Sequence, residues 1–271
     1  MQNKLSSESR YYRAVWISDV HLGSKACRAE FLLDFLNSIR CDYLYLVGDI
    51  IDLWAMQRSM YWPQLHNDVI RTILKMGDHG TKIIYVPGNH DGFMRDHEGM
   101  QFGAVTIQNE VIHKTADGRE LLVLHGDQFD DAVKCGKIES FLGNNAYSFL
   151  IWLNRNVNYV RRKLGFPYWS LATYLKQRVK SAATYMNRFE KAVMVEAHRR
   201  GVDGLICGHV HRAEVRYVDG VLYCNDGDWV ENCTALTETF DGTINLIHWA
   251  DQKKMLKKAD TDVRVAESKA A

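Results

Sequence analysis

The feature that most constrains the fold is a repeated pattern in which short apolar runs are followed directly by Asp, Asn or His. Each run is rich in β-branched and aromatic residues and is bounded by turn-forming residues, a combination that predicts a buried β-strand. Three runs lead to Asp19, Asp49 and Asn89, and two later runs lead to His125 and His209. Ligands in open α/β sheets bind beside the carboxyl ends of the strands, so we expect these residues to meet at one edge.

The segments between these runs indicate an α/β protein. Residues 28–39 and 65–76 carry apolar side chains at helical spacing, which predicts two helices. Residues 104–125 alternate and contain an Asp-Gly turn, which predicts a β-hairpin. Residues 203–249 return to short strand-like runs with two further Asp-Gly turns, from which we predict an antiparallel second sheet.

The composition excludes several classes of protein. The chain has 271 residues, is 46% hydrophobic and 25% charged, and has a formal net charge of +1, so it is neither disordered nor strongly charged overall. Its six cysteines include no CxxC pair, which favours a reducing compartment over a disulfide framework. The sequence has no signal peptide and no apolar run of about 18 residues. We therefore expect a cytoplasmic protein.

Residues 141–200 differ from the rest of the chain in charge. They hold 11 Lys and Arg against 2 Glu, a net charge of +9 that leaves −8 for the remainder. The segment also holds 11 aromatic residues in a helical pattern broken at residues 165–167. One interpretation is a helical pair with an aromatic core and a solvated basic face. We favour the other, a helical cap over an anionic, partly apolar substrate. After residue 249 the chain is polar, and we predict a flexible tail over residues 250–271.

The polar residues at the strand ends are of types that bind divalent metals. Imidazole, carboxylate and amide oxygen together suit Mn, Fe or Zn better than Ca. Two of the residues are two apart on an extended segment, so both side chains point to one side, and a later His-x-His pair repeats this. A single His is more often structural than a ligand, but two such pairs at strand ends rarely arise by chance. The candidate ligands are Asp19, His21, Asp49, Asn89, His125, His209 and His211.

Five motifs, in the order DVHLG, GDIID, GNHD, HGD and GHVH, resemble those of the calcineurin-like metallophosphoesterases. The resemblance implies a metallophosphoesterase domain over residues 13–249, with the cap inserted at 141–200. The implied fold class is α/β, a four-layer α-β-β-α sandwich of two mixed sheets flanked by helices. The implied cofactors are two divalent metal ions, with Mn as the first expectation and Fe or Zn as alternatives. One metal would be held by Asp19, His21 and His211, the other by Asn89, His125 and His209, and Asp49 would bridge both.

The resemblance also suggests residues that act beside the metals. His90 is expected to orient the phosphoryl group or to protonate the leaving group. Asp91 is expected to orient His90, as carboxylates commonly do. Asp52 and Asp127 stay open, because each either hydrogen-bonds a metal ligand or caps a following helix.

Within the family, the cap and the run GDIIDLW resemble the bacterial UDP-2,3-diacylglucosamine diphosphatase branch, which acts in lipid A synthesis at the inner-membrane surface. This resemblance implies cleavage of a pyrophosphate in a nucleotide-sugar lipid by a protein that is cytoplasmic or peripheral on the inner membrane. One departure is His90, where that branch carries Arg. The expected substrate contacts are Arg161, Arg162, Lys163 and Trp169.

Three other functions compete with this one. The first is a general metallophosphoesterase acting on a soluble phosphodiester, nucleotide or phosphoprotein. The second is a binding scaffold without catalysis, which the complete ligand set argues against. The third is binding of single-stranded nucleic acid by the basic, aromatic segment. We do not expect a nucleic-acid partner, because the remainder of the chain is acidic and carries no recognisable nucleic-acid motif.

Overall fold

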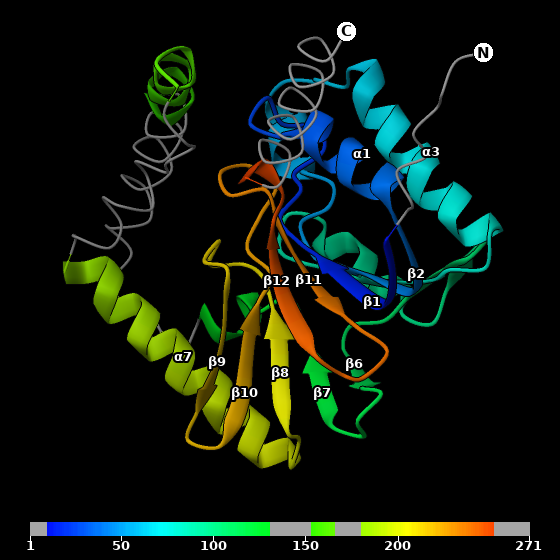
Figure 1. The fold of residues 1–271 in the computed structure, drawn as a ribbon, viewed down its shortest axis with the longest axis vertical. Helices are drawn as coiled ribbons and strands as arrows, with labels where there is room; N and C mark the ends of the chain where they lie inside the picture. The colour runs from blue at the N-terminus through cyan, green and yellow to red at the C-terminus, as the bar shows by residue number, and fades with distance from the viewer. Residues whose placement is uncertain (1–9, 131–152, 166–179, 252–271) are drawn as a thin grey trace, which may run out of the picture.

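Two β-sheets lie face to face between helices (Figure 1). The computed structural model describes residues 10–130, 153–165 and 180–251. Within them the first sheet has the order β12-β11-β1-β2-β3-β5-β4, and the second the order β6-β7-β8-β10-β9. The first sheet consists of β1 (Arg10–Ile17), β2 (Ile39–Val47), β3 (Lys82–Val86), β4 (Gln101–Phe102), β5 (Val105–Ile107), β11 (Thr234–Glu238) and β12 (Ile244–His248). The second consists of β6 (Val111–Lys114), β7 (Glu120–Val123), β8 (Gly204–Cys207), β9 (Glu214–Val218) and β10 (Val221–Asn225).

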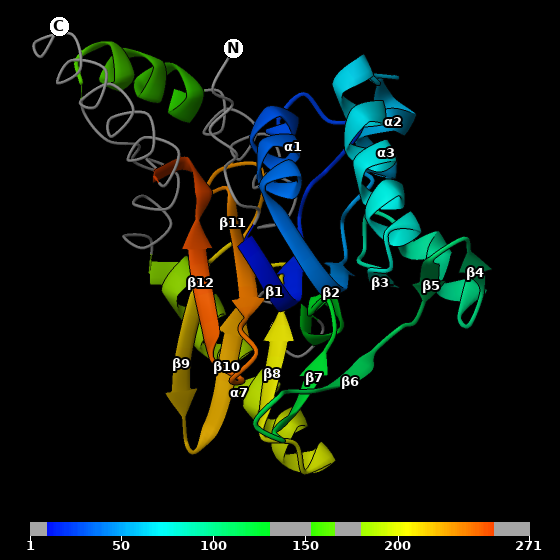
Figure 2. The same ribbon diagram turned by 45° about the vertical axis from the view of Figure 1, so that its right-hand side comes forward.

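The helices form the outer layers and the short connections. The longer helices are α1 (Ala29–Ser38), α3 (Gln64–Asp78) and α7 (Lys180–Arg200), and the shorter ones are α2 (Leu53–Arg58) and the 3₁₀ turns η1 (Gly92–His97) and η2 (Asp127–Phe129). In Figure 2, α1 and α3 cover the outer face of the first sheet, and α7 lies behind the second. The two helices predicted at 28–39 and 65–76 are α1 and α3.

Three separate apolar cores confirm the four-layer sandwich. Phe35 and Val69 belong to the core between α1, α3 and the first sheet. Trp16 belongs to the core between the two sheets. Phe189 and Leu205 belong to the core between the second sheet and α7. Burial of about 25 cal/mol per Å² of apolar surface is what holds such layers together.

The centre of each sheet is parallel, and this brings the strand ends together. β1, β2 and β3 run parallel in the first sheet, as do β7, β8 and β10 in the second. Each residue of β8 is buried, as expected for a strand covered on both faces. The carboxyl ends of these strands therefore meet at one edge of the sandwich, as the sequence predicts.

Two predictions about the sheets are wrong in part. Residues 203–249 do not form one antiparallel sheet, because β8 and β10 are parallel and β11 and β12 join the first sheet beside β1. The predicted hairpin is present as β6 and β7, but β5, which lies within the predicted range 104–125, pairs in parallel with β3. Turn chemistry specifies a local hairpin, whereas the sheet that the hairpin joins depends on distant strands.

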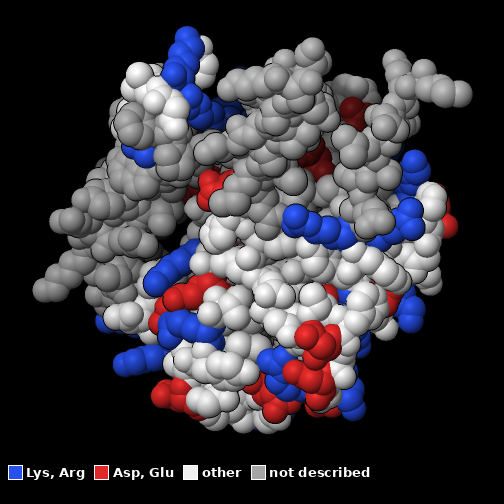
Figure 3. Space-filling model, viewed as in Figure 1, with Lys and Arg blue, Asp and Glu red and all other residues white. Residues whose placement is uncertain are grey.

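The segment predicted as a cap has parts with different surroundings. Residues 131–152 and 166–179, which include Trp169, lie outside the described residues, as does most of the predicted tail. α7 covers the second sheet with buried Phe189 and Val193, so it is a layer of the sandwich. Arg199 and Arg200 form ion pairs with Glu196. Figure 3 shows basic and acidic side chains mixed over the lower part of the face that it draws. For α7, these contacts support the interpretation as a core helix with a solvated basic face, and the cap over residues 141–200 stays a prediction.

The helix at residues 153–163 lies near the loop that follows β1. Its Arg155 donates a hydrogen bond of 2.9 Å to the carbonyl of Lys25. The guanidinium of Arg162 lies 5.4 Å from the ring centroid of Phe31 on α1. This part of the predicted cap therefore contacts the sandwich at the end where the strands lead into their polar residues. Among the described residues, none of the helices is long and apolar enough to cross a membrane.

Candidate metal centre

The backbone at the strand ends is held in an unusual conformation. Among the described residues, seven non-glycine residues have positive φ, and five of them are candidate metal ligands. Side chains with a Cβ rarely adopt this left-handed region, and such strain collects at functional sites. The strained candidate ligands are Asp19 (φ 49°), His21 (54°), Asp49 (54°), His209 (65°) and His211 (54°).

Close packing of backbone around Asp49 requires a glycine at position 88. A Cβ on Gly88 would lie 2.3 Å from Oδ1 of Asp49 and 2.7 Å from its backbone nitrogen. We expect Gly88→Ala to cost about 1–3 kcal/mol of stability through overpacking, with loss of bound metal. The matched control is Gly92→Ala, where a Cβ would meet nothing within 4 Å. Thermal unfolding and metal analysis of both variants test this. Equal metal content in the two would contradict the steric argument.

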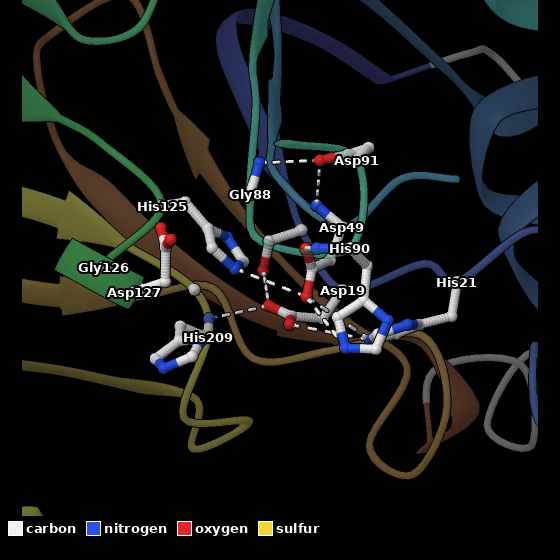
Figure 4. A network of polar contacts seen from close by, with 12 residues as sticks. Asp19, His21, Asp49, Gly88, His90, Asp91, His125, Gly126, Asp127 and His209 are labelled. Carbon is white, nitrogen blue, oxygen red and sulfur yellow. Dashed lines mark hydrogen bonds and ion pairs between the residues drawn. The ribbon is translucent and has the colours of Figure 1, made fainter. Parts of the chain in front are cut away.

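Asp49 lies at the centre of the cluster, buried and surrounded by imidazoles (Figure 4). Its Oδ2 is 3.5 Å from Nε2 of His125 and 3.9 Å from Nε2 of both His21 and His90. Its Oδ1 accepts a hydrogen bond of 2.8 Å from the backbone of His90. One carboxylate oxygen thus faces three ring nitrogens, which is the position expected of a bridging ligand.

Asp19 forms the second half of the cluster with two histidines. Its Oδ1 lies 3.0 Å from Nε2 of His211 and 3.8 Å from Nε2 of His21. Its Oδ2 accepts hydrogen bonds from Ser18 Oγ at 2.6 Å and from the backbone of His209 at 2.8 Å. The orientation leaves Oδ1 directed at the two imidazoles, as expected for the first metal position.

The donor atoms of this cluster fit divalent metals. His125 donates from Nδ1 to the carbonyl of Val47 at 2.8 Å, which leaves Nε2 as the nitrogen available to a metal. That Nε2 and Oδ1 of Asn89 are both buried without a hydrogen-bond partner. Unpaired buried polar atoms are costly, and a cation would satisfy both. Among the described residues, the groups close enough to hold an ion are Asp19/His21/His211, Asp19/Asp49/His125 and His21/Asp49/His90.

The electrostatics of the cluster also favour a cation. Burial alone would lower the pKa of His21, but its hydrogen bond with Asp52 and the charge of Asp49 raise that pKa to about 9. For His125, burial again acts to lower the pKa. The interaction with Asp49 outweighs burial, so the pKa of His125 rises well above its ordinary value. The carboxylates thus attract positive charge strongly. In the absence of metal, protons on the histidines provide this positive charge, and metal binding would release those protons.

Two of the seven candidate ligands, His209 and Asn89, lie outside these three groups. His209 belongs to none of the three groups, and its ring centroid lies 5.2 Å from that of His125. Its Nε2 is 2.8 Å from Oδ1 of Asp130, which leaves Nδ1 as the nitrogen available to a metal. Asn89 contributes the unpaired Oδ1 described above.

Asp52 holds both His21 and His90 in place. Its Oδ2 is 3.1 Å from Nδ1 of His21, and its Oδ1 is 2.9 Å from Nδ1 of His90. Oδ1 also accepts from the backbone of Ala55 at 2.8 Å and so caps α2. Both interpretations of Asp52 are therefore correct. With Nδ1 of each ring bound to a carboxylate, Nε2 of each ring is directed towards Asp49.

The expectation that Asp91 orients His90 is wrong. Asp91 is fully buried, and its carboxylate accepts hydrogen bonds from the backbone of Gly88 (2.7 Å), Asp49 (3.2 Å) and Ile50 (2.8 Å) and from the hydroxyl of Tyr85. It therefore ties the turn after β3 to the turn after β2. Its contribution is to place Asp49 rather than to contact His90.

Asp127 takes neither of the two roles considered for it. It begins η2 without a capping hydrogen bond from its side chain. Its Oδ1 instead accepts from Arg95 Nη2 at 2.6 Å, and the same nitrogen donates to the carbonyl of Pro87 at 3.1 Å. The pair joins the turn after β7 to the turn after β3.

Two functional features were missed from the sequence. Ser18 Oγ lies 2.6 Å from both Asp19 Oδ2 and Asp226 Oδ1 and joins the two carboxyl groups. Burial raises the pKa of Asp226 well above its ordinary value. The second feature is Trp54, whose ring centroid lies 4.2 Å from that of His90. A buried Asp within a turn-forming run, and an aromatic just after Asp52, were the available signals.

Three of the four expected substrate contacts belong to the described residues, and Trp169 does not. Arg161, Arg162 and Lys163 lie on the helix at residues 153–163. Arg162 contacts Phe31, and the ammonium of Lys163 lies 4.9 Å from the ring centroid of Tyr159. The role of all three residues in substrate binding stays a prediction.

Comparison with known proteins identifies the class. The model of the calcineurin-like phosphoesterase family matches residues 12–213. The match covers most of the chain and includes all seven candidate ligands. The protein belongs to the calcineurin-like phosphoesterase family and is a phosphoesterase, a hydrolase of phosphate esters.

The curated relatives narrow the comparison. The chain is 26% identical to the UDP-2,3-diacylglucosamine hydrolase of Neisseria gonorrhoeae over 229 residues, covering 79% of this chain and 88% of that protein. It is 26% identical to the enzyme of the same name from Edwardsiella ictaluri over 209 residues, covering 75% of this chain and 77% of that protein. Among solved structures, a mutant of Vps29 from Entamoeba histolytica has 16% identity and a TM-score of 0.42, covering 86% of this chain and 96% of that one.

Proposed function

We propose that the protein is a dinuclear-metal hydrolase that cleaves the diphosphate of UDP-2,3-diacylglucosamine or of a similar nucleotide-sugar lipid. The observation that carries the metal part is Oδ2 of Asp49, which faces Nε2 of three histidines within 3.9 Å. The substrate class rests on the curated relatives. They are named UDP-2,3-diacylglucosamine hydrolase, and this chain matches them over most of their length.

In this proposal the chain supplies two ligand sets and one proton donor. Asp19, His21 and His211 would hold one ion, Asn89, His125 and His209 the other, and Asp49 would bridge them. Two divalent ions in such positions polarise the phosphoryl oxygens and activate the attacking water. We take Mn as the first candidate, with Fe or Zn as alternatives.

His90 would act on the leaving group. Asp52 binds its Nδ1 at 2.9 Å, which directs Nε2 into the cluster. Trp54 also packs against the ring, with the two ring centroids 4.2 Å apart. The proton on Nε2 would pass to the departing phosphate or alkoxide oxygen. Asp91 would serve the reaction indirectly, through the backbone that carries Asp49.

The helix at residues 153–163 supports a lipid substrate. Tyr159 and Val160 on this helix, and Leu164 directly after it, are large hydrophobic residues that are exposed, and Arg162 and Lys163 lie between them in the sequence. Such a surface suits an acylated anion or an anionic bilayer. The proposal therefore includes a cytoplasmic protein in peripheral contact with the inner membrane. Co-sedimentation with anionic vesicles tests this part, and protein that stays in the supernatant contradicts it.

We expect the apparent affinity for substrate to rise with acyl length. Burying a chain gains about 0.8 kcal/mol per methylene, so two further carbons should lower KM by roughly tenfold. The measurement is a KM series, with Mn added, over nucleotide-sugar diphosphates that differ only in acyl length. The control is a small activated phosphodiester, whose hydrolysis should not depend on the apolar surface. A flat series would remove the lipid substrate from the proposal.

One observation favours a second candidate, a general metallophosphoesterase acting on a soluble phosphodiester, nucleotide or phosphoprotein. This chain has His90, bound to Asp52, where the diacylglucosamine diphosphatase branch carries Arg. A substrate panel of phosphomonoesters, phosphodiesters and nucleotide-sugar diphosphates distinguishes the two. The highest kcat/KM on an unacylated ester would favour this second candidate.

A further inference from the structure

The first part of α7 lies against the metal cluster as well as on the second sheet. Phe189, fully buried, has its ring centroid 6.2 Å from that of His209. A Cβ on Gly126, which follows His125, would lie 3.1 Å from the ring of Phe189. Tyr185, one helical turn earlier, stacks on Phe189 with centroids 6.3 Å apart. Two aromatic residues of one helix therefore support the strand ends that carry His125 and His209.

A hydrogen-bond chain runs from this helix to the candidate ligand. The hydroxyl of Tyr185 donates to Oδ1 of Asp130 at 2.7 Å, and the same oxygen is 2.8 Å from Nε2 of His209. A carboxylate only accepts, so Nε2 of His209 carries the proton and Nδ1 the free lone pair. Burial, and next the hydrogen bond with Asp130, raise the pKa of Tyr185 above its ordinary value, so its hydroxyl keeps the proton that it donates.

We infer that Tyr185 is a positioning residue that couples α7 to the metal site through Asp130 and His209. Asp130 fixes the tautomer and the orientation of the imidazole, and Tyr185 fixes the carboxylate that does so. The helix that ends the segment 141–200 thereby contributes to metal affinity as well as to the fold. Movement of α7 would change the direction of Nδ1 of His209. The inference rests on the proposed function, since it assumes that His209 is a metal ligand.

The test is the affinity for Mn, measured by equilibrium dialysis on the full chain. Asp130→Ala should weaken the Mn site that includes His209 by about 10–100-fold, as loss of a carboxylate partner of a metal-binding His does. Tyr185→Phe keeps the ring stacked on Phe189 and should weaken the same site by roughly three- to tenfold. The matched control is Tyr217→Phe on the exposed strand β9, which should bind Mn as the unaltered protein does.

A double variant separates positioning from a structural role. If Tyr185 acts through Asp130, Tyr185→Phe should have no further effect on Mn affinity in the Asp130→Ala background. An equal loss in both backgrounds, or no loss in either, would overturn the inference. Thermal unfolding of the chelated proteins should be the same for Tyr185→Phe and the unaltered chain. If the unaltered chain binds none of Mn, Fe and Zn, the proposed function itself fails, and the inference fails with it.

Discussion

Asp49→Ala is expected to abolish turnover and to lower the amount of bound metal. Asp49 Oδ2 faces Nε2 of His21, His90 and His125 within 3.9 Å, so its removal takes the shared oxygen from both metal positions. It also removes a negative charge that opposes repulsion between two divalent ions about 3.5–4 Å apart. Metal analysis by mass spectrometry and rate measurements on any accepted phosphoester provide the two readouts.

The control for this prediction is Asp78→Ala. Asp78 is exposed at the end of α3 and belongs to none of the three groups of described residues that are close enough to hold an ion. We expect that variant to keep both the metal and the rate of the unaltered protein. Equal metal in Asp49→Ala and the unaltered chain would exclude Asp49 as the bridge. Loss of metal with an unchanged rate would instead exclude the metals from the chemistry.

His90→Ala is expected to keep the metals and to lose rate. His90 belongs to none of the proposed ligand sets, yet Asp52 and Trp54 hold its ring with Nε2 towards Asp49. General acid catalysis contributes roughly 10²–10⁴-fold, so a loss of that size should appear in kcat. Metal content, measured on the same preparation, should match that of the unaltered protein.

The leaving group separates the two roles considered for His90. A good leaving group needs little protonation, so the loss should shrink for an activated aryl ester and be largest for a poor leaving group. His97→Ala, in the neighbouring η1, is the matched control and should leave the rate unchanged. The same loss for good and poor leaving groups would assign His90 to binding of the phosphoryl group.

The sequence was sufficient to predict which strand ends meet. An apolar run predicts a strand, and the Asp or His that follows it marks the carboxyl end of that strand. It could not assign the partner of His90. Asp91 is adjacent to His90 in the chain, but Asp52, 38 positions earlier, is the residue that binds it. Adjacent residues at a turn point in different directions, and the turn after β2 had to be placed in space before Asp52 could be chosen.

The sequence also could not predict to which sheet a strand belongs. β11 and β12 follow β10 closely, and their Asp-Gly turn correctly predicts a hairpin. Nothing in that hairpin specifies β1 as its neighbour, since the pairing joins Trp16 to Leu236 across most of the chain. The same limit applies to Asp130 and Asp226, whose roles depend on contacts with residues 79 and 208 positions away.

The pairing of β1 with β11 has a consequence for biosynthesis. Asp19 leaves β1 at the site, and the loop between β10 and β11 supports it, through Asp226 and through the backbone of Trp229, which donates to the carbonyl of Asp19 at 3.1 Å. Every strand end that carries a candidate ligand has left the ribosome before this loop and β11 appear. A nascent chain therefore contains all its ligands while it still lacks the support for the first of them. Complete assembly of this candidate metal site would have to await synthesis of the loop between β10 and β11, and contacts of such long range form slowly.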